Sequence, residues 1–350
     1  MKIKKTIDKH VHEIEFLKIA QLEKRLINNI SNRDILIFDR NIIKNKLIKK
    51  LLKKFSQRSF IIKGQEKIKN IDYYSSLIEK IIKLGVQRKT IIYSFGGGTL
   101  GDLTGFLAST ILRGVEHVMI PTSLLAMVDS SIGGKTGINS KFGKNLIGTF
   151  YLPKKVFICS DFLNSLPKRE IACGYSEIIK YSLIVSKPLY KLLIKGSKDD
   201  INKIIKLSIN SKLNYTNDFR EKLKSKNSRV ILNFGHTIGH AIENSNFYKG
   251  NIKHGEAISI GMIIELKISS FLNFYPKKVN NLIELLKKYN LPVNYSKYLN
   301  KKIIPSLIKK ITFDKKVINE DINMVLIGKN GGFIKKISIR KLKSILYQIK

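Results

Sequence analysis

Apolar positions in the first half of the chain fall into short runs separated by stretches with helical periodicity. The runs are rich in β-branched and aromatic residues, as expected of buried strands. They are DILIF (34–38), SFIIK (59–63), TIIYSF (90–95), HVMIP (117–121) and KVFICS (155–160). Regular alternation of strand and helix predicts an α/β domain built on a parallel sheet that helices cover on both faces.

The pattern changes after Pro167, where long helical periodicity takes over in REIACGYSEIIKYSLIV and GEAISIGMIIELKISSFL. We therefore expect a first domain over residues 1–167 and a mostly α-helical second domain over 168–350. The late runs MVLIG and GFIKKIS, joined around Gly331 and Gly332, predict a hairpin. Open α/β sheets bind ligands at the carboxyl ends of their strands, so we expect the active site in a cleft beside the helical domain.

The net charge is extreme, at +39 from 65 basic and 26 acidic residues among 350. Such a balance is typical of proteins that bind nucleic acid or anionic membranes. Here the lysines are spread along the chain together with abundant Ile and Asn, without a dense basic tail or a nucleic-acid module. We attribute the charge to compositional bias and expect neither a nucleic-acid nor a membrane partner.

The cellular compartment follows from three features. No uninterrupted apolar run is long enough to span a membrane. The start, MKIKKTIDKHVHEIEFLK, lacks the apolar core of a signal peptide and carries acids that a transit peptide avoids. Cys159 and Cys173 form no CxxC pair and are expected to be small core residues. We therefore expect a cytoplasmic protein.

A glycine-rich turn follows the strand TIIYSF. Gly96, Gly98 and Gly101 satisfy G-x-G-x-x-G between this strand and the helical run LTGFLAS, which is the setting of a dinucleotide-binding turn. The alternative is close packing at an ordinary strand-to-helix turn. Asp102, at the end of the run, suits a hydroxyl group such as that of a ribose better than a phosphate.

The segment DSSIGGKT (129–136) resembles a nucleoside-triphosphate loop because it ends in Gly-Lys-Thr. Asp129 stands where that loop needs its first glycine, and its carboxylate would repel a triphosphate. ATP or GTP hydrolysis is therefore not expected. Lys135, Lys144 and Asn145 are better explained as donors to a smaller anionic substrate, although surface lysines are the alternative.

Three of the six histidines lie within nineteen residues. His236 and His240 share a helix face, and His254 follows, which predicts a divalent-metal site with zinc favoured. Thr237 replaces the glutamate of the HExxH motif, so a metalloprotease is not expected. Ordinary core or surface histidines are the alternative. Glu177, one turn before Lys180, is the best carboxylate to complete the site.

The ordered motifs of this chain resemble those of the 3-dehydroquinate synthase family over residues 35–330. They are GGGTLGDLTGF, RGVEHVMIPTSLLAMVDSSIGGKTGIN, GKNLIG, GYSEIIKY, LNFGHTIGHAIE, HGEAISIGM and FDKK. The resemblance implies an N-terminal Rossmann-like NAD-binding domain, a helical metal-binding domain and a homodimer. It also implies that 3-deoxy-D-arabino-heptulosonate 7-phosphate is converted to 3-dehydroquinate and phosphate. The implied steps are transient oxidation by NAD, phosphate elimination, re-reduction and intramolecular aldol cyclisation.

The resemblance also implies roles for individual residues. One zinc or cobalt ion per chain would be held by Glu177, His236 and His254, with His240 nearby as a hydrogen-bonding group. The implied NAD contacts are Asp39, Glu66, Lys69, Gly97, Gly98, Thr99, Asp102, Thr122, Ser123, Asp129, Lys135 and Lys144. The implied substrate contacts are Arg113, Asp129, Lys135, Lys144, Asn145, Lys180, Lys212, Arg229, Asn233, His240 and Lys315, with Lys316 beside it. The implied catalytic residues are Lys135, Lys180, Arg229, Asn233, His240 and Glu221.

One segment departs from the family pattern. In NSKLNYTNDFREKLKSKNSRVILNFGH the spacer after DFRE is longer than usual, so Lys212 and Glu221 align only with small gaps. The stretch GQEKIKN is a loose match as well. The alternative function is that of a related NAD- and metal-dependent sugar-phosphate cyclase or polyol dehydrogenase. A simple dehydrogenase would lack the anion-binding cluster from Lys135 to Asn145.

Overall fold

The structure, a computed structural model, describes residues 1–7, 9–196, 200–217, 228–244, 252–274, 279–312, 317–318 and 320–350. Glu221, Lys315 and Lys316 lie outside these residues, so their roles stay predictions. The chain divides into two compact units, Met1–Pro167 and Lys168–Lys350.

The first unit is built on a seven-stranded sheet with the order β1-β2-β9-β6-β5-β3-β4. All neighbouring pairs are parallel except β1 and β2, which confirms the predicted parallel sheet. The strands are β1 (Lys2–Ile7), β2 (His10–Phe16), β3 (Ile35–Asp39), β4 (Ser59–Ile62), β5 (Ile91–Gly96), β6 (Glu116–Pro121) and β9 (Lys155–Ile158). β1 and β2 were not predicted, because β1 carries three lysines among its six residues and β2 buries His12 and Glu15 as well as Ile14.

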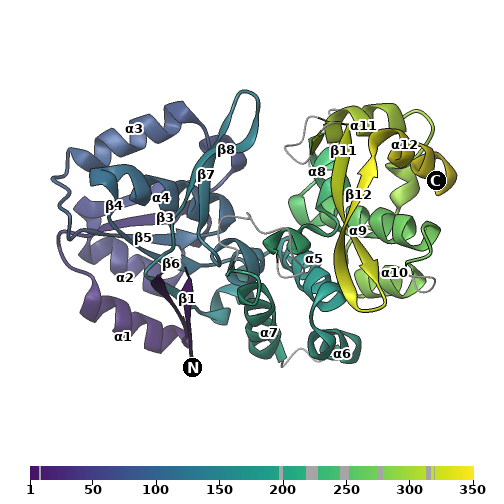
Figure 1. Cartoon of the computed structure of the whole chain (residues 1–350). Helices are drawn as coiled ribbons and strands as arrows, with labels where there is room; N and C mark the ends of the chain where they lie inside the picture. Colours follow the sequence, from purple (N-terminus) through teal and green to yellow (C-terminus); the bar gives the residue numbers. More distant parts are fainter. Residues whose placement is uncertain are drawn as a thin grey trace. The chain divides into compact units, whose positions relative to one another are not determined.

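Helices cover both faces of this sheet, so that all five residues of β3 are buried. Ile35 and Ile37 share a core with Leu77 of α3 and Leu103 of α4. Figure 1 shows α3 and α4 on one side of the sheet and α1 and α2 on the other. These helices are α1 (Ile19–Asn29), α2 (Lys46–Lys54), α3 (Ile71–Ile82) and α4 (Gly98–Thr110).

A separate two-stranded hairpin joins β7 (Lys135–Ser140) to β8 (Gly143–Phe150). Its strands approach closely at a glycine, because a Cβ atom on Gly148 would lie 2.2 Å from the Thr136 carbonyl oxygen. Lys135 therefore opens a strand, whereas the lysine of a triphosphate-binding loop precedes a helix. This agrees with the expectation from the sequence that DSSIGGKT is not a triphosphate-binding loop.

The second unit is mostly helical, as predicted. Its helices are α5 (Lys168–Ile184), α6 (Lys187–Lys195), α7 (Ile201–Leu213), α8 (His236–Glu243), α9 (His254–Phe271), α10 (Val279–Lys288), α11 (Ile304–Thr312) and α12 (Ile339–Gln348). A small antiparallel sheet accompanies them, with β10 (Val317–Ile318), β11 (Asp321–Gly328) and β12 (Gly331–Ser338). The pairing of β11 with β12 confirms the predicted hairpin.

The core of the second unit is organised around α9, which is buried along most of its length. Side chains from α8, α11, α12 and β11 meet it there, including Ile238, Leu307, Met324 and Leu342. No helix among the described residues combines the length and the apolar character needed to cross a membrane. Cys159 and Cys173 are both buried, as expected of core residues.

Two buried histidines of the first unit should make its stability depend on pH. Burial lowers the pKa of His12 to about 4, although a hydrogen bond with the Pro153 carbonyl opposes the shift. Burial also lowers the pKa of His117 to about 3. Both pKa values lie below the value of about 6.5 for a histidine in the unfolded chain. The two neutral rings therefore contribute fully to stability above pH ~6.5, and this contribution is lost as the pH falls from there toward the folded pKa values.

Each of these histidines should therefore cost about 1.4 kcal/mol of unfolding free energy between pH 7.5 and 5.5. Urea titrations at the two pH values measure this loss, and His117→Asn should reduce it by one histidine's share. If His117→Asn lost as much unfolding free energy between the two pH values as the unchanged protein, the prediction would be contradicted.

Candidate active site

The first unit gathers its predicted site residues at the carboxyl ends of the parallel strands. The strand order reverses at β3, which has β4 on one side and β5 on the other, and such switch points bind ligands. Asp39 ends β3, and its carboxylate faces Gly64, where a Cβ atom would lie 2.3 Å from Oδ2. A Cβ atom on Gly96, at the end of β5, would lie 3.3 Å from the Asp39 Cβ. A side chain at position 64 would displace the Asp39 carboxylate, and one at position 96 would first displace the Leu100 side chain, 2.6 Å away.

The turn from β5 into α4 offers donors to an anion. Gly97 caps α4 without a side-chain hydrogen bond, so the first N–H groups of the helix have no side-chain partner at the cap. Thr122 N–H donates to the Gly96 carbonyl at 2.9 Å. A Cβ atom on Gly98 would lie 2.7 Å from Ser130 Oγ, which is buried without a hydrogen-bond partner among the described residues. This hydroxyl is not among the predicted site residues, although it belongs to the DSSIGGKT motif.

Lys69 links the glycine-rich turn between β5 and α4 to the β7–β8 hairpin. Its buried ammonium lies 2.7 Å from Asp102 Oδ2 and also donates to Asn145 Oδ1. Burial raises the pKa of Asp102, and the charge of Lys69 opposes this shift only in part. Asn139 reinforces the connection, since it donates to Glu66 Oε1 at 2.8 Å and accepts from Asn145 N–H at 2.9 Å. Glu66, Lys69, Asp102 and Asn145 are thus brought together.

The other predicted residues of this unit lie on the hairpin, in the turn after β6 and beyond the far end of α4, and the charge of Asp129 helps to raise the pKa of Asp102. Lys135 and Lys144 are exposed on the hairpin, and Asp129 lies half-buried in the helical turn Ala126–Ser130. Arg113 follows α4 at the end opposite Gly98, and a helix of 13 residues is about 20 Å long. The structure therefore does not bring Arg113 to the glycine turn, and its predicted role stays untested.

In the second unit, Glu177 of α5, His236 at the start of α8 and His254 at the start of α9 form one cluster. Their ligand atoms lie within 4.8 Å of one another. His236 Nε2 is 3.5 Å and His254 Nε2 is 3.6 Å from Glu177 Oε1. These separations are longer than hydrogen bonds, and they leave the three side chains arranged around a common point.

The cluster fits a divalent cation. Glu177 is completely buried, and neither of its oxygens has a hydrogen-bond partner of normal geometry among the described residues, although the Lys180 ammonium forms an ion pair with it. Burial disfavours a charged His254, but the carboxylates of Glu177 and Glu243 outweigh it and raise its pKa to about 10. Burying Glu177 completely is costly unless positive charge compensates its carboxylate, and two imidazoles with one carboxylate are a common zinc ligand set.

Both histidines of this cluster have their Nδ1 atom held. His236 Nδ1 lies 3.1 Å from the Phe234 carbonyl oxygen, and His254 Nδ1 lies 3.2 Å from Glu243 Oε2. The sequence analysis did not single out Glu243. Its spacing on α8, three residues after His240 and seven after His236, places it on the same helix face and was a usable signal.

His240 lies beside the cluster, as the family resemblance implied. Its ring centroid is 5.1 Å from that of His236 and 5.9 Å from that of His254. His240, Glu243 and His254 also form a second group with ligand atoms close enough for a metal. The two groups share His254.

The packing of α8 on α9 fixes the position of His236. Gly261 of α9 lies so close to α8 that a Cβ atom there would be 2.0 Å from the Gly235 carbonyl oxygen and 2.8 Å from Gly239 N. Glu265, completely buried on α9, accepts hydrogen bonds from Gly235 N–H at 2.6 Å and Ile238 N–H at 3.1 Å. The start of α8 is therefore capped by a carboxylate from the neighbouring helix.

Buried cations accumulate around α5. Lys180 lies on α5 itself, Lys212 on α7 and Arg229 in the turn Arg229–Asn233, and all three are buried. Both α7 and that turn pack against α5. Asn233, half-buried, ends the same turn shortly before His236. The helical unit thus places three buried cations around α5.

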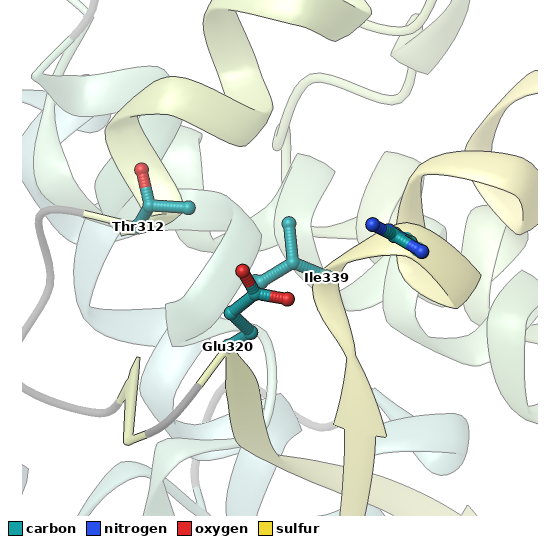
Figure 2. Close-up of a pocket in the computed structure, with 4 residues that line it drawn as sticks. Thr312, Glu320 and Ile339 are labelled. Atoms are coloured by element: carbon teal, nitrogen blue, oxygen red, sulfur yellow. The ribbon is translucent and has the colours of Figure 1, made fainter.

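A cavity of about 350 Å³ lies near the ends of α11 and β12. It is lined by Thr312, Glu320, Ile339 and Arg340, and Figure 2 shows the first three around the opening. None of the predicted site residues that the structure describes lines it, so it does not change the assignment of the site.

Two family models match adjacent parts of the chain. The model of the 3-dehydroquinate synthase N-terminal domain matches residues 59–173, and that of the C-terminal domain matches residues 174–317. The 3-dehydroquinate synthase of Pelagibacter ubique (strain HTCC1062) is 39% identical over 322 residues, which cover 89% of this chain and 86% of that protein. The enzyme of Prochlorococcus marinus (strain AS9601) is 41% identical over 320 residues, with the same coverage of 89% and 86%.

Solved structures of sugar-phosphate cyclases share the fold. A 2-deoxy-scyllo-inosose synthase superposes with a TM-score of 0.81 at 25% identity and covers 99% of both chains. The 2-epi-5-epi-valiolone synthase of Streptomyces hygroscopicus gives a TM-score of 0.81 at 20% identity, covering 97% of this chain and 96% of that one. The N- and C-terminal family models and the curated relatives, together with the motif order, lead to one conclusion. The chain belongs to the 3-dehydroquinate synthase family.

Proposed function

We propose that the chain converts 3-deoxy-D-arabino-heptulosonate 7-phosphate into 3-dehydroquinate and phosphate, with NAD and one divalent metal ion as cofactors. The observation that carries this proposal is the cluster of Glu177, His236 and the half-buried His254, in a chain about 40% identical to curated 3-dehydroquinate synthases. A homodimer in the cytoplasm is part of the same proposal.

NAD is supported by the fold neighbours and by the residues at the sheet edge. The valiolone synthase was solved with NAD+ and Zn2+, and an inosose synthase complex with carbaglucose-6-phosphate, NAD+ and Co2+. We assign the cofactor to the carboxyl ends of the strands, and NAD bound there would accept two electrons from one substrate carbon and later return them. The proposed contacts are Asp39, Glu66, Lys69, Gly97, Gly98, Thr99, Asp102, Thr122, Ser123, Asp129, Lys135 and Lys144.

Gly98→Val should weaken NAD binding at least about tenfold, because the new side chain must enter the space beside Ser130 Oγ where the start of α4 would meet the cofactor. Titration of the protein with NAD, followed by calorimetry, measures the change. Gly143→Ala is the control, since its Cβ atom meets only the Leu146 side chain, the nearest atom 3.3 Å away. Unchanged NAD affinity in Gly98→Val would remove the glycine turn from the cofactor site.

The metal is assigned to Glu177, His236 and His254, with zinc favoured and cobalt as the alternative. When bound, the ion would act as a Lewis acid that polarises the substrate hydroxyl group that is oxidised. Lys180 would share the negative charge of Glu177 and orient that carboxylate. His240 is proposed to hydrogen-bond the substrate beside the ion.

The remaining residues are proposed to hold the substrate anions. Lys180, Lys212 and Arg229 bring positive charge to the helical unit, where they would neutralise a carboxylate or phosphate and the charge that develops during elimination. We propose the same role for the hairpin residues Lys135, Lys144 and Asn145. The further proposed substrate contacts are Arg113, Asp129, Asn233 and Lys315, and Glu221 is retained as a proposed catalytic residue.

The function is tested by incubating the purified protein with the heptulosonate phosphate, NAD and Zn2+. We expect one phosphate and one 3-dehydroquinate per substrate consumed, with no net accumulation of NADH. Removal of the metal with a chelator should stop both products, and added Zn2+ should restore them. Steady formation of NADH without phosphate release would instead favour a polyol dehydrogenase.

A further inference from the structure

Glu243 and Glu177 lie on opposite sides of the His254 ring. Glu243 is the last residue of α8, and its Oε2 is 3.2 Å from His254 Nδ1. Glu177 Oε1 is 3.6 Å from Nε2 of the same ring. The two ring nitrogens therefore face two different carboxylates.

A carboxylate can only accept a hydrogen bond, so its partner on the ring must carry a hydrogen. Without an ion, each ring nitrogen of His254 can donate to the carboxylate beside it; when Nε2 binds a cation it gives up its hydrogen, and the hydrogen on Nδ1 stays with Glu243. His236 has the same arrangement, because its Nδ1 lies 3.1 Å from the Phe234 carbonyl oxygen while its Nε2 faces Glu177. Both rings are thus held with Nε2 directed toward one point.

The group His240, Glu243 and His254 is a competing assignment for the metal. In that group His254 would bind the ion through Nδ1, because this is the nitrogen beside Glu243. The Glu177 group has the stronger requirement for a cation, since Glu177 is completely buried and Glu243 is 14% exposed. Glu243 then contacts Nδ1 of the ligand His254, on the side of the ring away from the ion.

We propose that Glu243 is a positioning residue, which holds His254 with Nε2 toward the metal and strengthens that nitrogen as a ligand. Carboxylates behind metal-binding histidines fix the orientation of the ring and increase its basicity. The proposal rests on the proposed function only in taking Glu177, His236 and His254 as the ligands.

The test uses the full chain without substrate and measures Zn2+ affinity by competition with a chelator. Glu243→Leu removes the acceptor and should weaken Zn2+ binding by about 10- to 100-fold, with one ion per chain still bound at saturation. Glu243→Gln keeps an acceptor but removes the charge, and its affinity should lie between those of Glu243→Leu and the unchanged protein. Glu284→Gln is the control, because Glu284 is a surface residue on α10 that pairs with Lys287.

Two results would overturn the proposal. Unchanged affinity in Glu243→Leu would show that Glu243 has no effect on the ion. Loss of the ion in Glu243→Leu together with retention in Glu177→Gln would move the metal to the competing group. If circular dichroism shows that Glu243→Leu does not fold, the test uses Glu243→Gln loaded with Co2+. We expect the visible spectrum of the bound Co2+ to differ from that of the unchanged protein. An identical spectrum would contradict the proposal. Because no substrate is present, failure of the proposed reaction would not affect these measurements.

Discussion

Glu177→Gln should abolish tight metal binding and lower kcat by about three orders of magnitude or more. Glu177 supplies the only anionic ligand in the group with His236 and His254, and its carboxylate is completely buried. A neutral amide cannot compensate a divalent ion, so the Lewis acid is lost together with its contribution to the oxidation step. Metal content after dialysis and the rate of phosphate release measure the two effects.

The same substitution leaves Lys180 buried without its anionic partner at position 177, which should destabilise the fold by about 3 kcal/mol. Glu177→Gln combined with Lys180→Met should recover most of this stability without recovering the metal. Glu284→Gln, at the surface, should change neither property. Stoichiometric zinc in a folded Glu177→Gln protein would refute the ligand role of Glu177.

Gly261→Ala should lower the free energy of unfolding by about 3 kcal/mol and weaken metal binding at least tenfold. The added methyl group would lie 2.0 Å from the Gly235 carbonyl oxygen and 2.8 Å from Gly239 N, and backbone atoms cannot rotate away. The two helices must separate, and α8 carries His236 at its first residue. Urea unfolding and chelator competition measure the two changes.

Gly143→Ala is the matched control for stability, because its methyl group meets only the mobile end of a leucine side chain. It should change the free energy of unfolding by less than about 1 kcal/mol. A Gly261→Ala protein as stable as Gly143→Ala would show that the contact between α8 and α9 has room to relax.

The parallel sheet could be predicted because its buried strands are continuous apolar runs. β3, with every residue buried, was read directly as DILIF. β1 was missed because it is an edge strand whose lysines alternate with apolar residues, and a short alternating pattern is weak evidence by itself. The β7–β8 hairpin was missed because its pairing depends on close contact between Gly137 and Gly148, which no hydrophobic pattern reveals.

The candidate site could be predicted in part. Histidine spacing favoured the helical pair His236 and His240 together with His254, whereas the family motifs implied Glu177, His236 and His254, which the structure brings together. Two partners that orient them were not predicted: Glu243 could have been found from its spacing on α8, whereas Glu265 acts through the packing of α9 on α8, which no sequence pattern reveals. The bond between Lys69 and Asn145 likewise joins residues 76 positions apart.

The most direct test of this account is the position of the metal in crystals of the zinc-loaded protein, located by anomalous scattering. We predict one ion per chain, about 2.0–2.2 Å from a Glu177 carboxylate oxygen and from Nε2 of His236 and His254. An ion bound through His240, Glu243 and His254 Nδ1, or no ion at Glu177, would contradict it.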